Sequence, residues 1–118
     1  MADPASPVLP AAYGVDRVLA LPCDPHRLLV LWEVSAQGAG RAKDAMGRLG
    51  AGARLVLRVA DDRGASRDVP VTDWVGRRSV DGLTPGAAYV AAVGFLGADC
   101  FAPVAVSPPA PLPRHGPP

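Results

Sequence analysis

The sequence has little that would build a metal centre, a disulfide framework or a membrane segment. Only 2 of its 118 residues are cysteines, too few for a disulfide framework or a zinc site made of thiolates. No apolar run approaches the roughly 18 residues that a membrane span requires. The first ten residues, "MADPASPVLP", lack the basic start and apolar stretch of a signal peptide. We therefore expect a soluble, cytoplasmic protein without a membrane partner.

An excess of one charge is also missing. The formal net charge is +1, so the chain lacks the strong positive field by which proteins bind nucleic acid or anionic membrane surfaces. The sequence is instead rich in hydrophobic residues, which make up 49% of the chain. That content is enough for one hydrophobic core, and the length fits one domain.

Proline marks both ends of the chain. Residues 1–12 contain three prolines, and 108–118 read "PPAPLPRHGPP". Neither end has hydrophobic periodicity, so we expect a flexible Pro-rich segment over 1–12 and a disordered Pro-rich tail over 108–118. The folded domain is predicted at 13–107. Pro108 and Pro111 have the PxxP spacing of a polyproline ligand, but a plain linker is the favoured interpretation of the tail.

Short runs of alternating apolar residues fill most of the folded part. The strongest is 27–34, where Leu28, Val30 and Trp32 alternate with Leu29, Leu31 and Glu33, as in a central strand. Turn residues separate the runs from one another. The predicted strands are 17–21, 27–34, 53–60, 67–71, 77–80, 88–96 and 101–106.

One segment, 35–50, has helical rather than strand periodicity. Apolar residues recur there at the spacing of one helix face: Ala42, Ala45, Met46 and Leu49. Ser35 is a suitable N-cap and Gly50 a suitable stop. The glycines inside the segment each cost about 1 kcal/mol of helix stability relative to alanine, so we predict a short helix held by packing.

The phrase "LTPGAAYVAAV" (83–93) resembles the corner between two strands in fibronectin type III and other immunoglobulin-like domains. In that corner a tyrosine hydroxyl bonds back to the turn backbone, a structural role that the resemblance gives to Tyr89. Trp32 matches the buried tryptophan of such domains. The predicted fold is mainly β: an immunoglobulin-like antiparallel two-sheet sandwich of about seven strands with one short inserted helix.

A second resemblance covers most of the folded part. "LPAAYGVDRVLALPCDPHRLLVLWEVS" (9–35), "LVLRVADDRG" (55–64) and "LTPGAAY" (83–89) are similar to the bacterial family known as domain of unknown function 4912. The residues that match its opening phrase are Leu9, Pro10, Tyr13, Gly14, Arg17, Val18, Pro22, Asp24, Pro25, Trp32, Glu33 and Ser35. Cys23 stands where relatives usually have a basic residue, which argues against a shared thiol function. The resemblance implies no established activity.

Three reactive residues, Cys23, Asp24 and His26, lie within four positions. A nucleophilic cysteine needs a base and an oxyanion hole, and zinc needs three or four ligands. The other histidine, His115, lies in the tail. Prolines flank the group, so we interpret it as a turn in which Asp24 caps local N–H groups. Cys23 and Cys100 should lie at opposite ends of the sandwich and remain free thiols.

Acidic residues gather at Asp61, Asp62 and Asp68. Paired carboxylates can bind calcium or act as acid and base, but Asp-Asp-Arg-Gly between two strands is typical of a hairpin loop. No Ser-His-Asp order, phosphate-binding glycine loop or metal-binding histidine spacing occurs elsewhere. We therefore expect no enzyme activity, no cofactor and no metal.

The remaining expectation is a non-catalytic binding module for a protein partner, with Trp74, Arg77 and Arg78 as anchors. A loop tryptophan that only caps the core is the alternative role for Trp74. One alternative function is an accessory module for α-glucans or other carbohydrates, which requires Trp74 on a flat or concave face with polar neighbours. The other is a nucleic-acid accessory domain, which requires Arg54, Arg58, Arg77 and Arg78 on one face.

Overall fold

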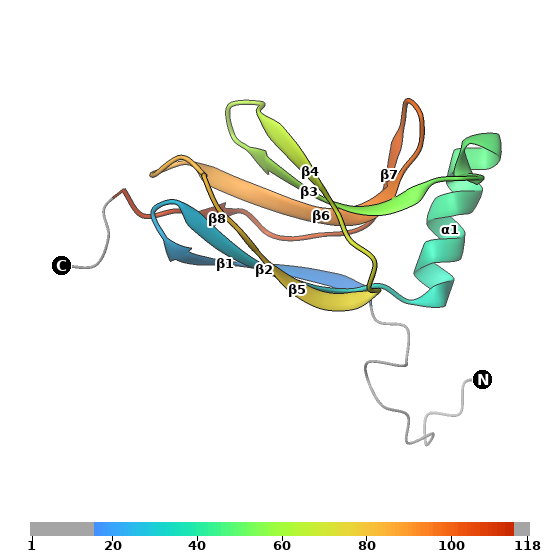
Figure 1. Ribbon diagram of the computed structural model, residues 1–118, viewed down its shortest axis with the longest axis horizontal. Coiled ribbons are helices and arrows are strands. Elements are labelled where there is room, and N and C mark those ends of the chain that lie inside the picture. Colours follow the sequence, from blue (N-terminus) through green and yellow to red (C-terminus); the bar gives the residue numbers. More distant parts are fainter. Residues whose placement is uncertain (1–15, 115–118) are drawn as a thin grey trace, which may run out of the picture.

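The computed structural model describes residues 16–114, which form two antiparallel sheets packed face to face with a helix at one end (Figure 1). One sheet has the strand order β1-β2-β5 and the other β4-β3-β6-β7, with β8 also paired to β6. The strands are β1 (Arg17–Asp24), β2 (Arg27–Glu33), β3 (Arg54–Asp61), β4 (Ser66–Pro70), β5 (Val75–Val80), β6 (Ala88–Leu96), β7 (Phe101–Val106) and β8 (Ala110–Pro111). The predicted two-sheet sandwich is confirmed.

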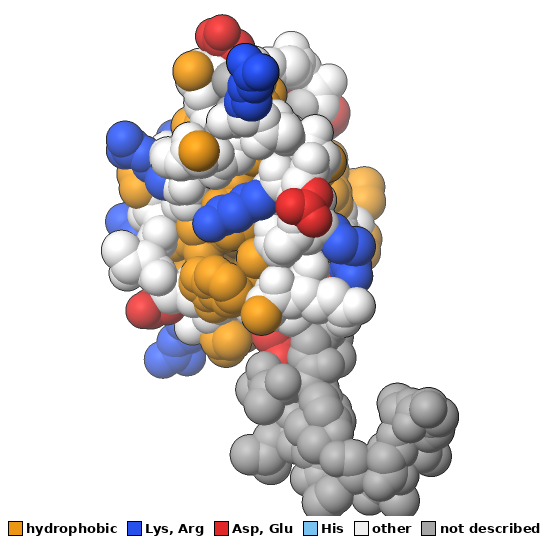
Figure 2. Space-filling model, turned by 90° about the vertical axis from the view of Figure 1, so that its right-hand side faces the viewer, with side chains coloured by type: hydrophobic (Ala, Val, Ile, Leu, Met, Phe, Trp, Pro, Cys, Tyr) orange, Lys and Arg blue, Asp and Glu red, His pale blue; other side chains and the backbone are white. Residues whose placement is uncertain are grey.

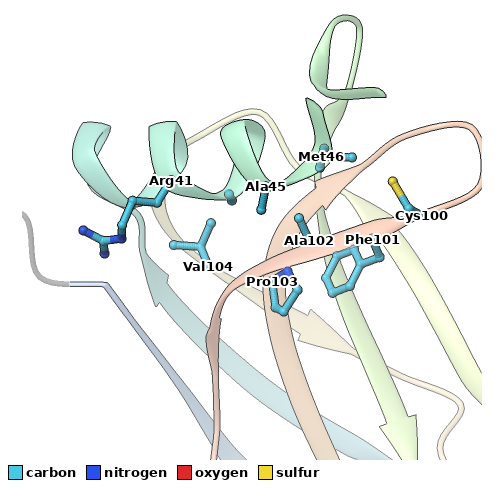
Figure 3. Close-up of a pocket in the computed structure, with 10 residues that line it drawn as sticks. Arg41, Ala45, Met46, Cys100, Phe101, Ala102, Pro103 and Val104 are labelled. Carbon is cyan, nitrogen blue, oxygen red and sulfur yellow. The ribbon is translucent and has the colours of Figure 1, made fainter. Parts of the chain in front are cut away.

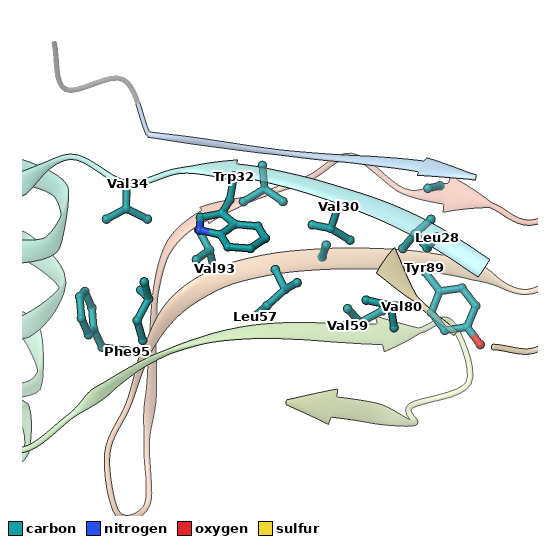
Figure 4. Close-up of a cluster of buried hydrophobic side chains, with 14 of the residues drawn as sticks. Leu28, Val30, Trp32, Val34, Leu57, Val59, Val80, Tyr89, Val93 and Phe95 are labelled. Carbon is teal, nitrogen blue, oxygen red and sulfur yellow. The ribbon is translucent and has the colours of Figure 1, made fainter. Parts of the chain in front are cut away.

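The core lies between the two sheets, and β2 provides its central row (Figure 4). Leu28 and Val30 are fully buried, as expected for one face of an alternating strand. Trp32 is also buried, and its indole N–H donates to the carbonyl oxygen of Asp73 at 2.8 Å. The predicted structural role of Trp32 as a buried tryptophan is therefore confirmed, and its N–H group has the partner that a buried indole needs.

The tyrosine corner is present at the start of β6. The backbone N–H of Thr84 donates to the Tyr89 hydroxyl at 2.9 Å, and the Tyr89 side chain is buried. Gly86 adopts φ +79° in the turn between them, a conformation that glycine adopts without steric cost. The structural role that the resemblance assigned to Tyr89 is confirmed.

Helix α1 spans Ala36–Met46 and covers one end of the sandwich (Figure 1). Ser35 is the N-cap as predicted, because its hydroxyl accepts from the backbone N–H of Gly38 at 2.8 Å. The predicted end at Gly50 is wrong: the α-helix ends at Met46, with Gly47 at φ +61° as its C-cap. A 3₁₀ turn, η2 (Gly47–Gly50), follows. The core-facing residues of α1 are Gly38, Ala39, Ala42 and Met46.

Asp16 fastens the start of α1 to the start of β1. Its carboxylate accepts a hydrogen bond from the backbone N–H of Ser35 at 2.6 Å and lies 3.5 Å from the guanidinium of Arg41. A Cβ on Gly38 would overlap this carboxylate, whereas a Cβ on Gly40 would meet nothing within 4 Å. Gly38 is therefore required by a close approach rather than by helix geometry.

The tail prediction is wrong for residues 108–114. β8 pairs with the start of β6, and the backbone N–H of Leu112 donates to the carbonyl of Ala87 at 2.9 Å. Ala110 and Leu112 are 4% exposed and belong to the core. The domain thus extends beyond the predicted boundary at 107, and the pairing holds the proposed PxxP segment along the sheet. The predicted 1–12 segment and His115 lie outside the described residues.

We predict opposite effects from alanine at two glycines of α1. Gly38→Ala should destabilise the fold by about 1–3 kcal/mol, because the new methyl group displaces Asp16. Gly40→Ala, the matched control, should stabilise it by up to about 1 kcal/mol through helix propensity alone. Urea unfolding followed by circular dichroism measures both values, and equal effects at the two sites would contradict the close approach.

We predict that Leu112→Ala lowers the free energy of unfolding by about 2 kcal/mol or more, because it leaves a cavity in the core. Pro109→Ala, an exposed change in the same segment, should alter stability by less than about 0.5 kcal/mol. Thermal and urea unfolding of the full chain provide the comparison. No difference between the two variants would mean that the segment is a separable linker.

Candidate functional site

The Cys23, Asp24 and His26 group forms the β1–β2 turn, as predicted. The carboxylate of Asp24 accepts a hydrogen bond from the backbone N–H of His26 at 2.8 Å, and the His26 ring nitrogen Nδ1 lies 3.1 Å from the carbonyl of Leu83. Both cysteines are free. Among residues 16–114, no three His, Cys, Asp or Glu side chains are grouped to hold a metal ion, and no helix is long and apolar enough to cross a membrane.

The acidic group is divided between a turn and an ion pair. Asp61 accepts hydrogen bonds from the backbone N–H groups of Arg63 and Ala65, both at 2.9 Å, and so shapes the β3–β4 hairpin. Asp68 pairs with the Arg58 guanidinium through two contacts, at 2.8 and 3.0 Å. Hydrogen bonding from Arg58 lowers the pKa of Asp68 below its usual 3.8. The hairpin interpretation of this group is confirmed.

The basic residues do not gather on one face. Arg54 and Arg58 lie on the outer face of the sheet that contains β3, because the core-facing residues of β3 are Leu55, Leu57 and Val59. Arg77 lies on the outer face of the other sheet, opposite Leu31. Arg78, its neighbour in β5, points the other way and reaches the carbonyl of Pro70. The arrangement required by the nucleic-acid hypothesis is absent from the described residues.

The outer face of the β1-β2-β5 sheet carries a cluster of apolar side chains. The strand register places Leu19 opposite Leu31 and Leu21 opposite Leu29, and Val75 opposite Glu33. Three of these side chains are about half exposed: Leu19 47%, Leu21 46% and Val75 53%. We call the surface formed by Leu19, Leu21, Leu29, Leu31 and Val75 the leucine face. Trp74, 41% exposed, directly precedes Val75, the first residue of β5.

A pocket of about 240 Å³ opens at the Glu33 end of the leucine face. Its walls are Arg17, Leu19, Leu31, Trp32, Glu33, Val75 and Gly76. The Glu33 side chain is only 8% exposed, and its Oε1 atom lies 3.3 Å from Nε of Arg17. Its other carboxylate oxygen, Oε2, is buried and has no hydrogen-bond partner among the described residues. The pocket therefore combines apolar walls with one unsatisfied acceptor.

A larger apolar groove, of about 430 Å³, lies between α1 and β7 (Figure 3). Arg41 stands at one end of it and Cys100 at the other, with Met46, Phe101 and Val104 along its length. Figure 2 views the molecule from the end that carries α1, where hydrophobic side chains gather between basic ones. The one charged group of the groove, Arg41, already pairs with Asp16. The groove thus offers apolar contact without an unsatisfied polar group.

The sequence analysis missed the leucine face, although β2 contained a signal for it. Its two alternating rows, Leu28, Val30 and Trp32 against Leu29, Leu31 and Glu33, are both largely apolar. Such a strand is predicted to be buried on both sides. In a sandwich of two layers only one side of each sheet faces the core, so one apolar row has to face outward.

The strand order and the tyrosine corner define an immunoglobulin-like β-sandwich. A family model described as "Domain of unknown function (DUF4912)" matches residues 13–118, and the chain belongs to this family. Among solved structures, the chain is similar to the FN1–FN3 domains of chicken CNTN1, with 14% identity and a TM-score of 0.48. That match covers 79% of this chain and 27% of that chain. A comparison with curated proteins finds no match.

We predict that the Arg58–Asp68 pair stabilises the fold at neutral pH and loses this effect in acid. A carboxyl group whose pKa is lowered on folding stabilises the protein above its unfolded pKa, and the effect disappears as the pH falls through the folded value. Asp68→Asn should therefore cost about 0.5–1 kcal/mol at pH 7. The difference should persist down to the usual pKa of 3.8 and vanish below it. Urea unfolding of both proteins from pH 7 to pH 2 tests this, and a constant difference would contradict it.

Proposed function

We propose that this chain is a non-catalytic module that binds a protein partner on its leucine face. The main support is the exposure of Leu19, Leu21 and Val75, which are about half exposed on one flat sheet face. Contiguous exposed apolar surface on a soluble domain commonly marks an interaction site. The face also carries polar groups at its margin, Arg17 and Arg77, as the rim of a protein interface does.

A carbohydrate has less support as the ligand. Sugars stack on aromatic rings, and aliphatic leucine and valine side chains line the leucine face instead. Trp74 is exposed, as the α-glucan hypothesis requires. That hypothesis also requires polar neighbours, and Trp74 has one on only one side: Asp73 precedes it, whereas the exposed apolar Val75 follows it. A nucleic acid has less support still, because the arginines are divided between the two sheets.

The anchors chosen from sequence are revised in this proposal. Trp74 and Arg77 remain as contacts at the margin of the leucine face. Trp74 adjoins Val75 in the sequence, and Arg77 lies opposite Leu31. Arg78 is left out, because adjacent residues of a strand point to opposite faces and Arg78 reaches Pro70 on the far side. The central contacts become Leu19 and Leu21.

We predict that Leu21→Asp abolishes partner binding and that Val106→Asp does not. Val106 is 56% exposed and lies on the other sheet, so it provides the same chemical change at a matched position. A charge introduced among the exposed apolar side chains of the interface should weaken binding about 30-fold or more. Pull-down from native-host lysate with the wild-type chain and both variants as baits, analysed by quantitative mass spectrometry, measures the effect.

Both variants change exposed side chains and should unfold within a few degrees of the wild-type chain, which circular dichroism checks first. A protein that the wild-type and Val106→Asp baits recover, and that Leu21→Asp loses, supports the leucine face. Proteins recovered equally by all three baits would contradict it. Retention of the wild-type chain on immobilised α-glucan, lost in Trp74→Ala, would favour the carbohydrate function instead.

A further inference from the structure

We infer that the pocket beside Glu33 receives an aromatic side chain with a polar edge, tyrosine or tryptophan, from the protein partner. This inference rests on the proposed function, because it places the anchor of that partner at one end of the leucine face. Three properties of the pocket support it: a buried acceptor without a donor, apolar walls, and guanidinium groups at its margin.

The acceptor is Oε2 of Glu33. The carboxylate has one ionic contact, from Arg17 to Oε1 at 3.3 Å, and Oε2 has no partner among the described residues. An ionised carboxylate accepts several hydrogen bonds, and burying one with an oxygen unpaired costs free energy. Because Glu33 lines the pocket, an incoming O–H or N–H group that turns its carboxylate toward the pocket would satisfy this oxygen through a charge-assisted hydrogen bond, the strong type in proteins.

The walls of the pocket fit the body of an aromatic ring. Leu19, Leu31 and Val75 supply aliphatic surface, and Trp32 and Gly76 also line the pocket. The buried Trp32 ring packs against Gly76, where an added Cβ would lie 3.0 Å from Trp32 Cζ2. Tyrosine and tryptophan combine an apolar body with one hydrogen-bond donor. They are also the side chains that most often dominate the energy of protein interfaces.

The charges around the pocket favour a neutral donor over a cation. Arg17 lines the pocket with 61% of its side chain exposed, and Arg77 projects from the neighbouring row beside Leu31. Arg17 balances the charge of Glu33, and Arg77, one strand pair away opposite Leu31, adds a further positive charge that would disfavour a lysine or arginine. Guanidinium groups attract the faces of aromatic rings, so the same two residues would hold the ring from its exposed side.

The test is an NMR titration of the full chain with small probes. p-Cresol carries the ring and hydroxyl of tyrosine, toluene carries the ring alone, and n-butylammonium carries the charge of lysine. We expect p-cresol to shift backbone amide signals of residues 17–19, 31–33 and 75–76, with an affinity about tenfold higher than that of toluene. Glu33→Met keeps the side-chain volume and removes the acceptor, so p-cresol should then bind no better than toluene.

Asp62→Asn is the matched control, because it removes one carboxylate at an exposed turn of the other sheet and should leave p-cresol binding unchanged. The stability of Glu33→Met gives a second readout: it should equal or exceed that of the wild-type chain, since an incompletely paired buried charge is removed. A large loss of stability in Glu33→Met would mean that the Arg17–Glu33 pair is structural and would overturn the inference.

Other outcomes separate this inference from the proposed function. Tighter binding of n-butylammonium than of p-cresol, or equal binding of p-cresol and toluene, would overturn the inference of an aromatic donor. Neither result would bear on partner binding by the leucine face. Sedimentation velocity tests whether a second copy of the chain occupies the pocket. A dimer that dissociates in Glu33→Met would contradict the inference that the aromatic side chain comes from a different protein. If Leu21→Asp loses the partner but p-cresol does not bind beside Glu33, the proposed function stands and the aromatic-pocket inference is overturned.

Discussion

Trp32 lies in the core, and its neighbours allow its ring only one orientation. The indole N–H donates to the carbonyl of Asp73 at 2.8 Å, which ties β2 to the segment that leads into β5. Along the adjoining edge of the ring, Gly76 provides the space that a Cβ would fill. Because strand residues alternate between faces, an inward Trp32 determines the register of all three strands. A slip by one residue would place Glu33 in the core and expose the tryptophan.

Most of the fold could be predicted because hydrophobic alternation is a local signal. The predicted strands 88–96 and 101–106 agree with β6 and β7 residue by residue. The start of α1 was also predictable, since the Ser35 side chain makes its own capping bond. The end of the helix depended on which glycine takes a positive φ, and Gly47 does so whereas Gly50 does not. β8 was missed because its burial depends on a distant element, the start of β6.

The candidate site was less predictable, because it depends on which sheet face is covered. Arg77 and Arg78 could have been separated from sequence alone, since neighbours in a strand point to opposite faces. The leucine face could not have been located in the same way. Both rows of β2 are apolar. The predicted burial of Trp32 indicates which row faces the core, but only the tertiary arrangement shows that the β4-β3-β6-β7 sheet packs on that side and leaves Leu29 and Leu31 on the outer face.

In the proposed interface, Glu33 contributes to partner recognition and costs the folded protein stability. Its neighbours on the leucine face are aliphatic, and a methionine would fill its place without burying a charge. The Arg17 contact compensates for only part of the desolvation, since it is single and its guanidinium is largely exposed. Charged groups at interfaces discriminate between partners more than they add affinity. A carboxylate with one free oxygen beside an apolar wall therefore fits a surface that selects a partner by the placement of one donor.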